Sequence, residues 1–129
     1  MGNIIMNILF SELSQVEGLD IWDGISHVGN NPEVFYDILR QFCGEFDGLL
    51  GHLEEALAQK DWKDYTIRIH AFKGAFANIG AEDLRAWAYE LEMAAKNGEY
   101  DKCTADTPKI IERMKQFRDS LLKTSLIKP

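Results

Sequence analysis

His70 and Lys73 are the residues of this chain whose types and spacing best suit chemistry, and Gly74 directly follows Lys73. The imidazole of histidine titrates near neutral pH, so its free form can act as a nucleophile. In a helix, a lysine three residues later lies on the same face, where its ammonium group can pair with phosphoryl oxygens. A histidine that stays in water, beside a cation and with space around it, is suited to accept and release a phosphoryl group.

The sequence on either side of His70 has the pattern of an amphipathic helix, because residues three, four and seven apart share a face at about 100° per residue. The face opposite His70 carries large apolar side chains: Tyr65, Ile69, Phe72, Phe76 and Ile79. The face of His70 carries Lys63, Thr66, Ile67, Lys73, Gly74 and Ala77. A continuous apolar stripe normally faces a core, so His70 is predicted to point into solvent.

Two small residues, Gly74 and Ala77, lie on the predicted face of His70. A glycine inside a helix costs about 1 kcal/mol relative to alanine, so it usually has a packing or approach reason. Our interpretation is that Gly74 leaves room for a partner protein to come close to the histidine. The predicted docking residues around His70 are Thr66, Ile67, Gly74 and Ala77.

Residues 69–98 resemble the histidine-containing phosphotransfer (HPt) domain family. The family pattern combines His-x-Leu-Lys-Gly, a stretch of small residues, Gly-Ala-x-x-Leu, and Leu-Glu before a glycine. The matching residues are His70-Ala71-Phe72-Lys73-Gly74, Ala77-Asn78-Ile79-Gly80-Ala81, Leu84, Leu91-Glu92, Ala94-Ala95 and Gly98. One departure is Phe72, where leucine is usual, which exchanges one apolar residue for another on the core face.

The resemblance implies a phosphocarrier of a multistep phosphorelay in two-component signalling. His70 would take a phosphoryl group from an aspartate of one response-regulator receiver domain and pass it to another receiver, with Lys73 as its charge partner. The receivers would belong to a hybrid sensor kinase, a downstream regulator or both, and would supply Mg²⁺, so the chain would need no cofactor of its own. The resemblance also places Glu92 near His70, either as a residue that orients the imidazole or as a solvated carboxylate.

Two other functions remain open. A helical adaptor could bind a receiver or another partner without carrying phosphate, although this leaves the group of His70, Lys73 and Gly74 unexplained. A small enzyme could use His70 as a general base, which would require a concave pocket and a second polar group converging on the histidine. The chain has neither a G-x-x-x-x-G-K-[ST] loop nor a kinase signature, so we expect a phosphocarrier that does not itself use ATP.

The composition narrows the range of partners. The formal net charge of −7 disfavours nucleic acids and anionic membranes, and no carboxylate cluster is typical of a metal site. No apolar run is long enough to span a bilayer, and residues 1–6 lack the basic start of a secretory signal. We expect a cytoplasmic protein in which Cys43 and Cys103 are reduced, since their number and spacing indicate no disulfide framework.

The predicted fold is all-α: an antiparallel, up-down-up-down four-helix bundle with additional short N-terminal helices. We expect one domain over residues 1–129, with a helical lead-in at 1–18 and the bundle at 31–123. Helices are predicted at 4–16, after Asp20, at 32–59, at 61–80, at 82–97 and after Thr107-Pro108. Such a bundle closes its core without a partner, so we expect a monomer.

Overall fold

The structure is a computed structural model and describes residues 2–127. The helices of this part of the chain are α1 (Gly2–Ser14), α2 (Ile21–Ser26), α3 (Pro32–Ala58), α4 (Trp62–Ile79), α5 (Glu82–Lys96) and α6 (Tyr100–Leu122). No strand occurs in residues 2–127. Met1 and residues 128–129, which the single-domain prediction includes, lie outside the described residues.

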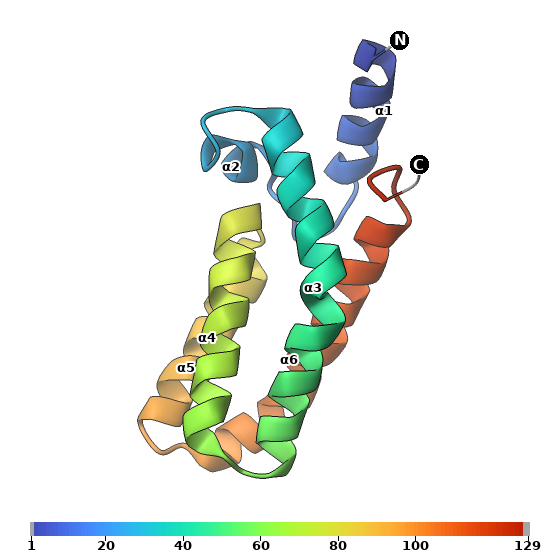
Figure 1. Ribbon diagram of the computed structural model, residues 1–129. Helices are drawn as coiled ribbons and strands as arrows, with labels where there is room; N and C mark the ends of the chain where they lie inside the picture. The colour runs from blue at the N-terminus through green and yellow to red at the C-terminus, as the bar shows by residue number, and fades with distance from the viewer. Residues whose placement is uncertain (1, 128–129) are drawn as a thin grey trace.

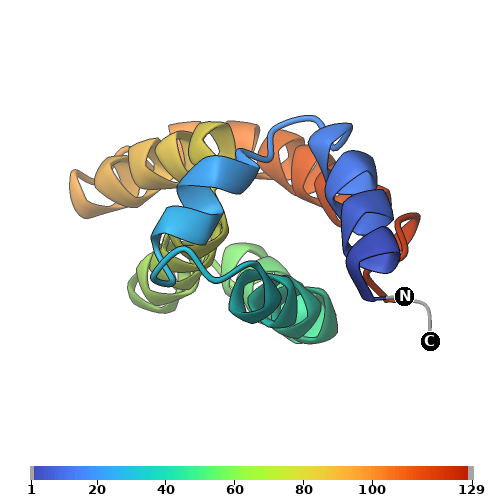
Figure 2. The same ribbon diagram turned by 90° about the horizontal axis from the view of Figure 1, so that it is seen from above.

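The four longest helices form the bundle that the sequence predicts. Consecutive helices run in opposite directions, and α3 packs on both α4 and α6, while α5 packs on both α4 and α6 (Figure 1). Seen from above, α2 lies across one end of the bundle, and α1 lies to one side, near the C-terminal end of α6 (Figure 2). The all-α bundle prediction is confirmed. Within residues 2–127, no helix is both long enough and apolar enough to cross a bilayer.

The apolar stripe of α4 faces the core as predicted, and its five side chains are at most 1% exposed. Phe72 and Phe76 join an aromatic cluster with rings from α3 and α6. Phe76 lies 5.8 Å from Phe42 and 6.5 Å from Phe117, measured between ring centroids. Burying a phenylalanine side chain contributes about 1.5–3 kcal/mol, so these contacts fix the rotation of α4 about its axis. That rotation determines which α4 residues face solvent.

Gly80 ends α4, and its backbone contacts the residue that precedes α2. Its φ of 78° lies in the left-handed region, which glycine adopts without the cost that a Cβ imposes. The Gly80 carbonyl accepts a hydrogen bond from the backbone N–H of Asp20 at 2.9 Å. A Cβ at position 80 would collide with the carbonyl oxygen of Asp20. The glycine therefore allows the chain entering α2 to lie directly against the end of the histidine-bearing helix.

One helix boundary was predicted incorrectly. The last helix does not begin after Thr107-Pro108 but at Tyr100, and Pro108 lies inside α6. Proline lacks a backbone N–H and usually disfavours a helix interior, which is why Thr107-Pro108 resembled a helix start. Tertiary contacts hold the extra turns: the Tyr100 ring stacks on Trp62 with centroids 4.6 Å apart. The buried hydroxyls of Thr107 and Tyr65 are also hydrogen-bonded at 2.7 Å.

Candidate functional site

His70 lies midway along α4 with its side chain in solvent, as predicted. The side chain is 61% exposed, while its helix neighbours Ile69 and Phe72 are fully buried. The ring is not free to turn, because its Nδ1 atom lies 2.7 Å from Oε2 of Glu92 on α5. The exposed helix face thus presents an imidazole that is held at one nitrogen.

Glu92 reaches this position from the buried face of α5. Its side chain is only 2% exposed, so the alternative of a solvated carboxylate is wrong. Ala88 and Ala95 are buried one turn before it and about one turn after it. Small residues let two helices approach closely, and the carboxylate therefore lies at the packed junction of α4 and α5. The burial keeps Glu92 fixed relative to His70.

Two lysines contact the buried carboxylate. Lys73 Nζ lies 2.7 Å from Glu92 Oε1, and Lys96 Nζ lies 3.2 Å from Oε2. Oε1 has no well-aligned hydrogen-bond donor, so its contact with Lys73 is an ion pair. Lys73 Nζ also lies 5.4 Å from the centroid of the Tyr89 ring, within the range of a cation–π contact.

Burial and charge act in opposite directions on Glu92. Burial alone would raise the pKa of its carboxyl group, because a low-dielectric environment disfavours the charged form. Contacts from Lys73, His70 and Lys96 favour the carboxylate and outweigh burial, so the pKa falls to about 2. Glu92 is therefore ionised at neutral pH and can only accept hydrogen bonds. The proton shared with His70 must then reside on Nδ1.

The predicted docking residues share the exposed side of α4 but differ in accessibility. Ile67 is 55% exposed. At Gly74, an added Cβ would meet no atom within 4 Å, so packing inside this chain does not require a glycine there. Thr66 and Ala77 are half-buried, and the Thr66 hydroxyl donates to the Trp62 carbonyl at 2.8 Å. Ile67 is therefore the most exposed of the predicted docking residues, and Gly74, itself half-buried, has open space where a side chain would lie.

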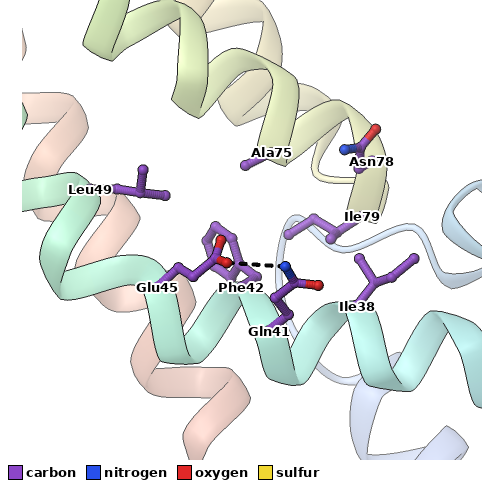
Figure 3. Close-up of a pocket in the computed structure, with 8 residues that line it drawn as sticks. All are labelled: Ile38, Gln41, Phe42, Glu45, Leu49, Ala75, Asn78 and Ile79. Carbon is purple, nitrogen blue, oxygen red and sulfur yellow. Dashed lines mark hydrogen bonds between the residues drawn. The ribbon is translucent and has the colours of Figure 1, made fainter.

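A groove between α3 and α4 adjoins this surface, and sequence reasoning did not predict it (Figure 3). Its volume is about 200 Å³, and it is lined by Ile38, Gln41, Phe42, Glu45, Leu49, Ala75, Asn78 and Ile79. Gln41 donates a hydrogen bond to Glu45 at 3.0 Å on the α3 side. Ala75 directly follows Gly74, so the groove begins beside the open position on α4.

Sequence reasoning also missed Lys96 and Tyr89. The signal for Lys96 was its position four residues after Glu92, since residues at this spacing form ion pairs on a helix. Tyr89 carries no comparable signal, because its contact with Lys73 depends on how α4 packs on α5. Together with the predicted trio of His70, Lys73 and Glu92, these residues make up the candidate site.

Comparison with protein families identifies the domain in which these residues lie. The family model for the Hpt domain matches residues 37–122, which span most of α3 and all of α4, α5 and α6. Comparisons with curated proteins and with solved structures gave no match. Hpt domains act in histidine phosphotransfer within phosphorelays and interact with receiver domains. The family model covers well over half of the chain, which therefore belongs to the Hpt domain family.

Proposed function

We propose that this chain is a histidine phosphotransfer protein of a multistep phosphorelay, in which His70 accepts a phosphoryl group from a receiver aspartate and passes it to another receiver. The observation that carries the proposal is the hydrogen bond between His70 Nδ1 and the buried carboxylate of Glu92. This contact orients the ring and holds its proton on one nitrogen. The other nitrogen, Nε2, keeps its lone pair free for attack.

The transfer step follows from this arrangement. The Nε2 lone pair attacks phosphorus while the bond between phosphorus and the aspartyl oxygen breaks, and the aspartate leaves as a carboxylate with the bonding electrons. The new N–P bond leaves a positive charge on the ring, which still carries its Nδ1 proton. Glu92 places a negative charge 2.7 Å from that nitrogen, so it favours both the orientation and the charge of the product. Passing the phosphoryl group onward reverses these bond changes.

Charge neutralisation around the phosphoryl group is divided between the two proteins. Lys73 lies on the same helix one turn after His70 and can turn toward phosphoryl oxygens as a point charge. Phosphoryl transfer depends mainly on positioning and on neutralising the charges of the oxygens. In this proposal the receiver supplies the Mg²⁺ ion that completes the neutralisation. Ile67 and the open position at Gly74 let the receiver approach the ring. The partners are receivers of a hybrid sensor kinase, a downstream regulator or both, and the carrier acts as a cytoplasmic monomer.

Phosphate transfer from a panel of phosphorylated receiver domains in the presence of Mg²⁺ tests the proposal. His70→Gln should remove the label, while His52→Gln, which changes an exposed histidine on α3, should keep it. The label should be lost in acid and retained in alkali, as expected for phosphohistidine. If receivers bind the chain but label neither the wild type nor the His52 variant, the adaptor function replaces the phosphocarrier function.

A further inference from the structure

Three groups share the carboxylate of Glu92, and their charges do not balance. His70 Nδ1 and Lys96 Nζ contact the same oxygen, Oε2, at 2.7 and 3.2 Å, and Lys73 Nζ contacts Oε1 at 2.7 Å. Two ammonium groups therefore face one carboxylate, which leaves one positive charge uncompensated among these contacts. A phosphoryl group on His70 would carry about −1.5 to −2 charges near neutral pH, so this excess is of the sign that it requires.

The carboxylate of Glu92 and the two lysines also differ in their freedom to move. Glu92 is 2% exposed and packed between helices, whereas Lys73 is 23% and Lys96 is 52% exposed. A lysine ammonium sits on a flexible four-carbon chain and rotates its donors freely. The carboxylate is consequently the fixed member of the group, and the ammonium of Lys96 is the most mobile.

We infer that Lys96 is a second phosphoryl-binding residue, and that Glu92 holds Lys96 and Lys73 beside His70 until the phosphoryl oxygens recruit their ammonium groups. The inference rests on the proposed function and extends it to a residue on the neighbouring helix. A phosphoryl group on Nε2 would compete for these ammonium groups with a carboxylate that carries only one negative charge. Because Lys96 Nζ and His70 Nδ1 contact the same oxygen, Oε2, the ammonium already lies beside the ring that would carry the phosphoryl group.

The second ionisation of the phosphoryl group tests this inference, because a nearby cation favours the dianion. The chain is phosphorylated chemically with phosphoramidate, without any receiver, and ³¹P NMR follows the titration. The His70 signal is identified by its absence from His70→Gln. Lys96→Met should lower the second ionisation constant about fivefold, the effect of one partly exposed ion pair. Lys96→Arg should retain the wild-type constant.

The matched control is Lys109→Met, which removes an exposed lysine that pairs with Asp106 three residues before it. This variant has the same net charge as Lys96→Met and should leave the constant unchanged. An equal constant in wild type and Lys96→Met, or an equal decrease in both methionine variants, would overturn the inference. If His70 takes phosphate from phosphoramidate but from no receiver, the proposed function fails while the Lys96 titration still decides this inference.

Discussion

Replacing Glu92 with glutamine removes one charge from the site while keeping nearly the same shape. The amide oxygen can still accept a hydrogen bond from His70 Nδ1. Lys73 and Lys96, however, lose the carboxylate that they contact at 2.7 and 3.2 Å. We expect Glu92→Gln to destabilise the protein at neutral pH, because glutamine resembles the protonated carboxyl group that the folded state disfavours.

The size of this effect follows from the pKa of Glu92. A decrease from 4.5 to about 2 on folding corresponds to about 3 kcal/mol of stabilisation of the ionised form. Lys96 is half-exposed and its charge is partly screened by solvent, so we expect Glu92→Gln to cost about 2 kcal/mol. Because the folded pKa is the lower one, this stabilisation is complete above about pH 4.5. It is lost as the pH falls toward 2.

Urea unfolding followed by far-UV circular dichroism measures this difference. The free energy of unfolding of the wild type should exceed that of Glu92→Gln by about 2 kcal/mol at pH 7 and by less than about 1 kcal/mol at pH 3. Glu90→Gln, an exposed change two residues away on α5, should stay within about 0.5 kcal/mol of the wild type. A Glu92 variant as stable as the wild type at pH 7, or a difference independent of pH, would refute this reasoning.

Three further predictions concern two glycines and one proline in the bundle. Gly74→Leu should preserve or raise helical stability but slow transfer from a receiver at least tenfold, whereas Gly44→Leu, at an α3 position that also has open space for a Cβ, should transfer at the wild-type rate. Gly80→Ala should lower the free energy of unfolding by about 2 kcal/mol in urea titrations, because position 80 is left-handed and a Cβ there meets the carbonyl of Asp20. Pro108→Ala should raise the free energy of unfolding by about 1–3 kcal/mol, since alanine restores the N–H missing inside α6. An unchanged free energy of unfolding in either urea experiment would contradict the corresponding backbone argument.

The sequence was sufficient to predict the helices wherever local pattern and tertiary packing agree. In α4, large apolar residues recur at helical spacing, and the same spacing exposes His70. In α6, the two disagree: Pro108 locally favours a helix start, but contacts of Tyr100 and Thr107 with α4 extend the helix to earlier residues. These contacts join residues far apart in sequence, so a local pattern does not contain them.

The candidate site likewise combines residues that local spacing groups together with contacts that depend on tertiary packing. His70, Lys73 and Gly74 lie within one helical turn and could be grouped from their spacing alone. Whether Glu92 contacts the imidazole depends on how closely α5 approaches α4, which is set by packing at small buried residues such as Ala88. The groove beside Gly74 likewise depends on the separation of α3 and α4, and no periodicity in either helix indicates it.

The most direct test of the central claim is to locate the phosphoryl group after transfer from a phosphorylated receiver. In chain labelled with ¹⁵N-histidine, the account predicts a one-bond ³¹P–¹⁵N coupling at Nε2 of His70, with Nδ1 still protonated beside Glu92. A coupling at Nδ1, a phosphoryl group on His27 or His52, or no phosphoryl transfer from any receiver would contradict it.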